Sequence, residues 1–160
     1  IRDSVMWLNV KKFGLEAALE ELLEDKFAAQ DDVAYDFVDD HRAKPLTEDV
    51  RVLLFQSVRE ILINIIKHAR ASRIRLDIRR AGNSIIIRVA DDGVGFDVEE
   101  VFSLPPRRRG FGLLNIKERL DYIGGTLEIR SRLGAGSRFV LTAPLKMEDH
   151  EPDAGQDSAR

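Results

Sequence analysis

Four polar residues that could bind a metal ion or phosphates recur at helical spacing in the segment that ends at His68. Glu60 and Asn64 are four residues apart, so on a helix they share one face, and Lys67 and His68 follow one turn later. An asparagine amide oxygen is a hard ligand suited to Mg²⁺, a lysine supplies charge to phosphates, and a glutamate can hold or polarise a water molecule. The alternative is that the four residues form the solvated stripe of an amphipathic helix, and the segment alone leaves both interpretations open.

A second group of residues stands at the exit of an apolar segment, in Asp91-Asp-Gly-Val-Gly95. Asp91 follows the apolar run 84–90 and can accept a hydrogen bond from the exocyclic amine of a base. Gly93 and Gly95 would let a ring pack against bare backbone. Asp-Gly after a strand is also an ordinary turn signal, and Asp92 fits that role better because it directly precedes Gly93.

Two glycine-containing segments complete the candidate site. Gly110-Phe-Gly112-Leu113 opens a predicted helix, where backbone amides form an anion site. Arg109, the last of three consecutive arginines, could close on phosphates, although a basic run is usually solvated surface. Gly134-Ala-Gly136-Ser137 is a hairpin turn, and Ser137 can also contact the base side of a ligand. Each signal is modest, but the four motifs in this order predict a nucleotide site.

The elements that must position these residues follow from hydrophobic periodicity. Helical spacing predicts helices at 15–27, 50–68 and 113–123, and Thr47 is the capping residue of the second. Alternation and turn signals predict strands at 33–38, 74–79, 84–90, 126–132 and 137–145. Residues 97–109 are predicted to be irregular, and 146–160 to form a disordered polar tail. Hairpins with helices between them predict a two-layer α/β (α+β) sandwich, a mixed, largely antiparallel sheet covered by helices on one face.

The composition excludes several classes of function. The chain has 160 residues, is 44% hydrophobic and 33% charged, and carries a net charge of -3, so no global basic field argues for nucleic acid. The absence of cysteine excludes disulfides, thiolate zinc sites and a cysteine nucleophile. No apolar stretch is long enough to span a bilayer. The chain starts at Ile1 rather than methionine, which favours a piece of a longer protein.

The stretch from Thr47 to Leu145 resembles the ATP-binding domain of bacterial sensor histidine kinases, which has the Bergerat, or GHKL, fold. The matching segments resemble the N box (Glu60 to Ala69), the G1 box (Asp91 to Gly95), the G2 box (Gly110 to Leu113) and the last glycine box (Gly134 to Phe139). The Lys-His-Ala ending, the short lid and Lys117-Glu-Arg119 look most like the subfamily paired with response regulators of the helix-turn-helix type. Residues 14–40 resemble the lead-in segment of that subfamily. We therefore expect a lead-in helix and strand at 1–46, an ATP-binding core at 47–145 and the tail.

The resemblance also implies roles for individual residues. Asp91 would recognise the adenine amine of ATP, Asn64 would bind Mg²⁺, and Glu60 would orient a water molecule or act as a base. Lys67 and His68 would meet phosphates. The pocket and its lid would be framed by Arg109, Leu113, Ser137, Gly93, Gly95, Gly110 and Gly112. Ser137 stands where the family usually has threonine, a change that keeps the hydroxyl.

The function implied is that of the catalytic domain of a two-component sensor histidine kinase. It would bind Mg-ATP and transfer the γ-phosphate to a histidine on a separate dimerisation helix, for relay to a response regulator. None of the three histidines (His41, His68 and His150) lies in a helical pattern before the ATP motifs, so the phosphoacceptor is expected on an absent segment. The domain is expected to be cytoplasmic and monomeric, without direct contact to nucleic acid or membrane.

Two alternatives stay open, and the second belongs to a different class of function. An anti-sigma-factor-type serine/threonine kinase shares the fold and the boxes but usually comes as a whole small protein, so the full reading frame discriminates. A non-catalytic nucleotide-sensing module would keep the fold without transferase activity, and only an activity assay separates it. DNA-working ATPases with this fold are less favoured, because the chain is short and acidic and lacks their additional domains.

Overall fold

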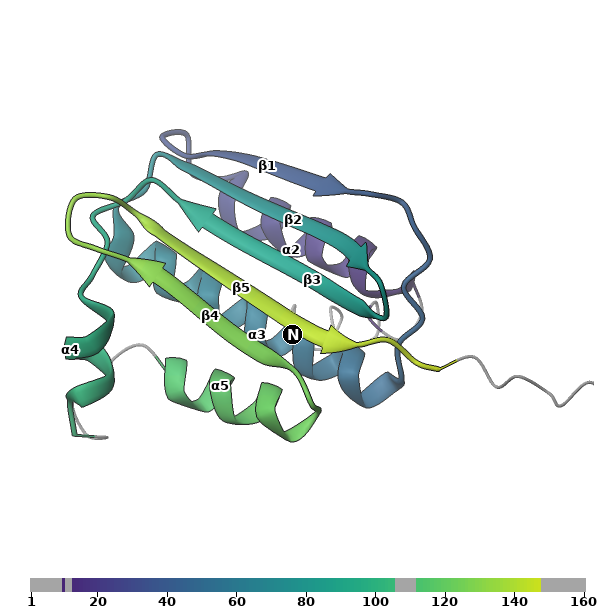
Figure 1. Ribbon diagram of the computed structural model, residues 1–160. Coiled ribbons are helices and arrows are strands. Elements are labelled where there is room, and N and C mark those ends of the chain that lie inside the picture. The colour runs from purple at the N-terminus through teal and green to yellow at the C-terminus, as the bar shows by residue number, and fades with distance from the viewer. Residues whose placement is uncertain (1–9, 11–12, 106–111, 148–160) are drawn as a thin grey trace, which may run out of the picture.

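The computed structural model describes residues 10, 13–105 and 112–147, and these form a five-stranded sheet with helices on one face (Figure 1). The order of strands across the sheet is β1-β2-β3-β5-β4; β1 runs parallel to β2, and all other neighbours are antiparallel. The strands are β1 (Ala34–Asp39), β2 (Arg73–Ala81), β3 (Ser84–Asp91), β4 (Thr126–Ser131) and β5 (Ser137–Pro144). This arrangement confirms the predicted two-layer sandwich with a mixed, largely antiparallel sheet.

The helices differ in length and in how they begin. They are α2 (Leu15–Phe27), α3 (Glu48–Asn64), α4 (Val98–Ser103) and α5 (Leu113–Tyr122), and a π-helical turn, η1 (Ile65–Ala69), follows α3 directly. Thr47 caps α3 as predicted, since its hydroxyl accepts a hydrogen bond from the amide of Val50. Two acidic residues in the first turn of α3 complement the positive end of its dipole.

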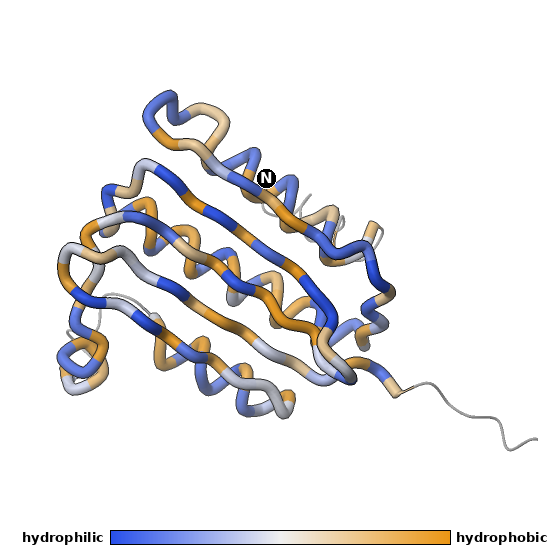
Figure 2. The backbone as a smooth tube through the Cα atoms, turned by 45° about the horizontal axis from the view of Figure 1, so that its top comes forward, coloured by the Kyte–Doolittle hydropathy of each residue, from blue (hydrophilic) through white to orange (hydrophobic). Residues whose placement is uncertain are grey.

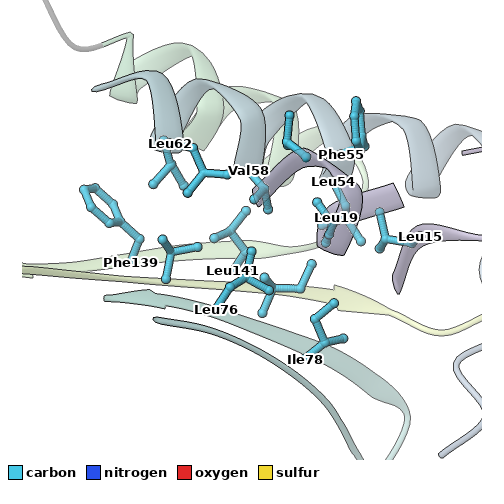
Figure 3. Close-up of a cluster of buried hydrophobic side chains, with 14 of the residues drawn as sticks. Leu15, Leu19, Leu54, Phe55, Val58, Leu62, Leu76, Ile78, Phe139 and Leu141 are labelled. Carbon is cyan, nitrogen blue, oxygen red and sulfur yellow. The ribbon is translucent and has the colours of Figure 1, made fainter. Parts of the chain in front are cut away.

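The core lies between the sheet and the helices. Figure 2 shows hydrophobic and hydrophilic residues alternating along the strands, as expected for a sheet with one covered face. In the close-up of Figure 3, Leu62 and Val58 of α3 point toward Phe139 and Leu141 of β5. All four side chains are at most 2% exposed. Burial of α3 against the sheet is therefore what fixes the N-box segment over the end of β3.

Strand alternation sends Asp91 to the covered face. The inward residues of β3 are Ile85, Ile87, Val89 and then Asp91, which is the last residue of the strand. The register pairs Asp91 with Ser137 across β3 and β5. A carboxylate and a hydroxyl thus share the inner face at the same end of the sheet.

Two features of the fold differ from the sequence-based prediction. Residues 97–109 are not irregular throughout, because α4 occupies Val98–Ser103. Asp97 accepts a 3.1 Å hydrogen bond from the amide of Glu100, which is an N-cap three residues before an acid. The second difference is that the long helix does not run as α-helix to His68 but changes to a π turn after Asn64.

The described part of the chain continues just past β5. The amide of Leu145 donates to the carbonyl of Asn83, and that of Lys146 donates to the carbonyl of Pro45. Residues 148–160 of the predicted tail lie outside the described residues. Across the ranges that the structure describes, every helix is too short or too polar to span a bilayer.

Candidate functional site

The candidate site is a pocket where the end of α3 meets the end of β3. Residues from three segments far apart in the sequence meet there. The lining residues are Asn64, Ile65, His68, Ala69, Asp91, Gly95, Phe96, Ser137 and Phe139. The structure thus brings together members of the first, second and fourth predicted motifs.

The π turn η1 determines which N-box residues face this pocket. A π-helical turn closes hydrogen bonds from i to i+5 and is wider than an α-helical turn, and such turns are frequent at functional sites. Asn64 and His68 line the pocket, whereas Lys67 is exposed and is not among the lining residues. The helix ends at Arg70, which adopts the left-handed conformation with φ 49°. A non-glycine residue there is uncommon.

Asp91 is the most chemically distinctive residue of the pocket. Its side chain is buried, with a residue exposure of 9%, and its Oδ1 accepts a 2.8 Å hydrogen bond from the amide of Gly93. Its Oδ2 is buried without a hydrogen-bond partner among the described residues. Burial raises the pKa of Asp91, and the neighbouring charge of Asp92 adds to this effect. An orphaned buried acceptor of this kind fits a ligand that supplies an N–H donor.

Ser137 lies beside Asp91 and is held by Ser131. The hydroxyl of Ser131 accepts from the amide of Phe96 at 2.9 Å, donates to the carbonyl of Gly136 at 2.9 Å, and lies 2.8 Å from the hydroxyl of Ser137. Because Ser131 has only one hydroxyl hydrogen, Ser137 is the donor in the serine pair when Ser131 donates to Gly136. Ser137 then keeps an acceptor for a ligand.

The walls of the pocket are apolar and aromatic. The rings of Phe96 and Phe139 stack with centroids 6.3 Å apart at an interplanar angle of 30°. Ile65 and Ala69 of η1 are buried and contribute the facing wall. An apolar pocket with a buried carboxylate among its lining residues is suited to an aromatic base that carries an amino group.

The glycines of the G1 segment allow backbone segments to touch. A side chain on Gly93 would place Cβ 2.2 Å from the carbonyl oxygen of Ala69. Gly95 has φ 65°, and a Cβ there would lie 2.1 Å from the carbonyl oxygen of Arg132. Gly93 therefore packs against η1, while Gly95 packs against the β4–β5 hairpin and also lines the pocket.

Asp92 serves the fold, as the turn interpretation expects. Its carboxylate accepts hydrogen bonds from the amide and hydroxyl of Ser72, at 2.8 and 2.6 Å, and from the amide of Arg73 at 2.9 Å. The hydrogen bond from the Ser72 side chain, with that from the Arg73 amide, lowers the pKa of Asp92. The two adjacent carboxylates thus have different surroundings. Asp92 accepts several hydrogen bonds, whereas Oδ2 of Asp91 accepts none from the described residues.

Glu60 lies outside the pocket lining and is held by α5. Arg119 Nη1 donates to Glu60 Oε2 and Nη2 to Oε1, both at 3.2 Å, so the pair is bidentate. Glu60 Oε2 also lies 3.9 Å from the position that a Cβ on Gly112 would take. The candidate catalytic carboxylate therefore faces the start of α5.

The G2 segment is described only from Gly112 onward. Gly112 adopts φ 60° as the residue before α5, and its carbonyl accepts from the amide of Ile116 at 3.2 Å. Leu113 is buried at 2% exposure and anchors the helix rather than facing the pocket. Arg109 and Gly110 lie outside the described residues.

Asn64 is a pocket-lining residue whose side chain could contact a metal ion. Among the described residues, no cluster of three or more His, Cys, Asp or Glu could hold an ion. Mg²⁺ commonly keeps several waters and combines one or two protein oxygens with substrate phosphates. The amide oxygen of Asn64 on the pocket wall fits that donor set.

Sequence reasoning assigned no role to several residues that support the site. Phe96 and Phe139 are apolar residues that come just after Gly95 and Ser137 in the sequence. This closeness to the motifs is the only sequence signal that they form a wall of the pocket. The role of Arg119 has no local signal, because Glu60 is 59 residues away in the sequence.

Comparison with known proteins finds a matching family and named relatives. The profile of the family described as "Histidine kinase-, DNA gyrase B-, and HSP90-like ATPase" matches residues 49–147. The chain is 35% identical over 142 residues to an "Uncharacterized sensor-like histidine kinase" from Chloroflexus aurantiacus, covering 87% of this chain and 24% of the relative. It is 32% identical over 109 residues to "Signal transduction histidine-protein kinase/phosphatase DegS" from Bacillus subtilis, covering 68% of this chain and 27% of the relative. The chain thus spans about a quarter of the length of these curated relatives.

Solved structures show the same fold. The catalytic domain of histidine kinase ThkA superposes with a TM-score of 0.65 at 19% identity, covering 82% of this chain and 90% of that one. The Erythrobacter litoralis EL346 blue-light activated histidine kinase gives a TM-score of 0.67 at 17% identity, covering 82% of this chain and 42% of that one. With the family profile covering residues 49–147 and relatives named as histidine kinases, the chain belongs to the family of histidine kinase-, DNA gyrase B- and HSP90-like ATPases.

Proposed function

We propose that this chain is the ATP-binding catalytic domain of a sensor histidine kinase and that the pocket around Asp91 holds the base of Mg-ATP. The observation that carries the proposal is the buried Oδ2 of Asp91, which has no hydrogen-bond partner in the described part of the chain. The exocyclic amine of adenine would donate to this oxygen. Oδ1 remains bound to the Gly93 amide, so the carboxylate is already oriented.

The remaining contacts to the base would come from the pocket walls. The stacked pair Phe96 and Phe139 and the buried Ile65 offer apolar surface to both sides of a ring system. The hydroxyl of Ser137, directly across the sheet from Asp91, would reach the same edge of the base. These groups combine apolar burial with a polar anchor, as in other sites for flat ligands.

The phosphates would then extend along η1 toward the start of α5. Asn64 would contribute its amide oxygen to a Mg²⁺ ion, which supplies charge neutralisation for the phosphates when bound. His68 lines the pocket and would contact phosphate oxygens, and the exposed Lys67 would reach them from the solvent side. In this assignment, the three residues that contact the phosphates or the metal ion all belong to the N-box segment.

Phosphoryl transfer would use an acceptor histidine from outside the described residues. An imidazole nitrogen forms a bond to the γ-phosphorus while the bond from that phosphorus to the bridging oxygen breaks, and ADP leaves with that electron pair. Glu60, acting directly or through a water molecule, would accept the imidazole proton. The histidine phosphate would then pass to an aspartate of a response regulator.

Calorimetry with Mg-ATP tests the pocket directly. Asp91→Asn should abolish binding, because an asparagine whose oxygen accepts from Gly93 turns its NH₂ group toward the adenine amine, donor against donor. Asn64→Ala should weaken binding and remove most of its dependence on Mg²⁺. Asp121→Asn, an exposed carboxylate on α5, is the matched control and should bind like the wild type.

The outcomes separate the proposal from its rivals. A wild-type chain that does not bind millimolar Mg-ATP has a degenerate site, and the proposal fails. Binding without phosphotransfer to any histidine or serine acceptor, assayed in the whole protein that contains this chain, favours a nucleotide-sensing module. Acid-stable phosphoserine instead of acid-labile phosphohistidine favours the anti-sigma-factor type of kinase.

A further inference from the structure

The Glu60–Arg119 pair connects the candidate catalytic carboxylate on α3 with helix α5. Both guanidinium Nη atoms take part, each donating to a different carboxylate oxygen. The two side chains are 34% and 32% exposed, so the pair lies at the rim of the α3–α5 contact. A bidentate pair fixes the plane of the carboxylate as well as its position, which a single hydrogen bond does not.

Arg119 is itself held in place by the packing of α5. The buried residues of α5 are Leu113, Ile116 and Leu120, spaced along one face, and all are at most 2% exposed. Arg119 precedes the last of these anchors. Its guanidinium therefore projects from a fixed helix, and the position of Glu60 depends on how α5 packs on α3.

We propose that Arg119 is a positioning residue that holds the carboxylate of Glu60 toward the start of α5. This inference rests on the proposed function, since it assigns a role to a neighbour of the candidate base. The approach of Glu60 Oε2 to within 3.9 Å of a Cβ site on Gly112 shows which way the carboxylate faces. Arg119 leaves each carboxylate oxygen with a further lone pair for a water molecule or an imidazole N–H.

An ion pair this exposed contributes little to folding, so its loss should show in the rate of transfer rather than in stability. The bidentate pair with Glu60 needs both the positive charge and the two N–H donors of the Arg119 guanidinium, whereas lysine supplies only a point charge. Arg119→Lys should therefore restore only part of the activity that Arg119→Ala loses.

The test is a double-mutant cycle on phosphoryl transfer in the whole protein that contains this chain, at saturating Mg-ATP. Glu60→Gln should lower the rate about 100-fold or more, as the loss of an acid–base group does. Arg119→Ala should lower the rate about 10-fold or more, because it misplaces that group without removing it. The double variant should be no more than about 3-fold slower than the slower single variant, because residues that act as a unit are not additive. The dissociation constant for Mg-ATP should stay within about 2-fold of the wild type in all three variants.

Arg130→Ala is the control, because Arg130 forms a 2.9 Å pair with Glu128 on the open face of the sheet. It should leave the rate unchanged. Additive losses in the cycle, a wild-type rate for Arg119→Ala, or full rescue by lysine would each overturn the positioning role while leaving the proposed function intact. A wild-type rate for Glu60→Gln overturns this role and the base assignment together, and a wild-type protein that binds Mg-ATP without transferring phosphate overturns both the role and the proposed function.

Discussion

The amide of Val94 donates a 2.7 Å hydrogen bond to the carbonyl oxygen of Ala69, the last residue of η1. The carbonyl of Val94 in turn accepts a 2.7 Å hydrogen bond from the amide of Gly134 in the β4–β5 turn. One residue of the loop after β3 therefore joins the N-box helix to the hairpin that carries Ser137. Backbone hydrogen bonds thus join the three segments that line the pocket, and the positions of the lining side chains depend on these bonds.

Gly93→Ala should destabilise the protein by about 1–3 kcal/mol or more, as overpacking does. The added Cβ would lie 2.2 Å from the carbonyl oxygen of Ala69, so η1 and the loop would have to separate. Urea unfolding followed by circular dichroism measures the loss. Mg-ATP affinity should fall in the same variant, because the separation moves Ala69 away from the pocket.

Gly82→Ala provides the comparison for that variant. Gly82 has φ 58° and no atom within 4 Å of the position that a Cβ would take, so only backbone strain opposes alanine there. We expect a loss of about 1 kcal/mol without a change in nucleotide affinity. Equal losses at both positions would show that close packing against Ala69 does not limit the choice at Gly93.

Asp91→Asn should make the nucleotide-free protein more stable at neutral pH. Burial raises the pKa of Asp91 above its ordinary value of 3.8, so the folded state holds its proton more tightly than the unfolded state. Ionisation of Asp91 therefore costs stability as the pH rises from about 3.8 through the folded pKa, and the full cost is present above it. The stability advantage of Asp91→Asn should grow across that range and then level off.

Urea unfolding at a series of pH values measures this advantage, with Asp121→Asn as the exposed control. The asparagine keeps an acceptor for the Gly93 amide, so the hydrogen bond there should survive. A pH-independent difference, or an asparagine variant that is less stable at neutral pH, contradicts the expectation. Asp91, the residue that would bind adenine, thus lowers the stability of the nucleotide-free protein.

Lys44 and Asp40 join the end of β1 to the hairpin of β2 and β3. The Lys44 side chain is fully buried and pairs with Asp39 at 2.9 Å and with Asp40. Asp40 also accepts hydrogen bonds from the amides of Arg80 and Arg42. Although burial opposes ionisation, the hydrogen bonds from Lys44 and from the two amides hold the pKa of Asp40 well below its usual range.

This cluster predicts a loss of stability in acid. A depressed pKa contributes stability that is present above the unfolded value of 3.8 and is lost as the pH falls through the folded pKa. Asp40→Asn should therefore flatten the acid limb of a plot of unfolding free energy against pH. Lys44→Met should cost about 1–3 kcal/mol at neutral pH, because it leaves two acids without their buried partner. Lys146→Met, an exposed position, should leave both quantities unchanged, and equal effects from both lysines would exclude a special role for Lys44.

Local patterns in the sequence were sufficient to predict most elements and the position of Asp91. Helix α2 has the predicted bounds Leu15–Phe27, and Asp91 lies inward at the end of β3 because strand alternation fixes its side. The short helix α4 was predicted as irregular, although the spacing of Asp97 and Glu100 carried a capping signal.

The parts that could not be predicted depend on contacts between distant segments. An apolar repeat at i and i+4 is compatible with α-helix through His68, and the change to a π turn shows only in the structure. The Glu60–Arg119 pair joins residues 59 positions apart, which no local pattern encodes. Ser131 supports Phe96 across 35 residues for the same reason.

Deletion of Ile66 should separate the role of η1 in the site from its role in the fold. A π turn accommodates one residue more than an α-helical turn over the same rise, and Ile66 is 38% exposed, so its removal allows the segment to close as α-helix with little loss of packing. The deletion also narrows the turn and shortens the spacing between Asn64 and His68 by one residue, so the two pocket-lining side chains lose the relative placement that the π turn gives them. We expect a change in unfolding free energy within about 1 kcal/mol and a loss of Mg-dependent ATP binding of about 10-fold or more. The control is Ile66→Ala, which keeps the chain length and should bind Mg-ATP normally. A deletion variant that binds as tightly as the wild type would show that the π turn is not needed to aim Asn64 into the pocket.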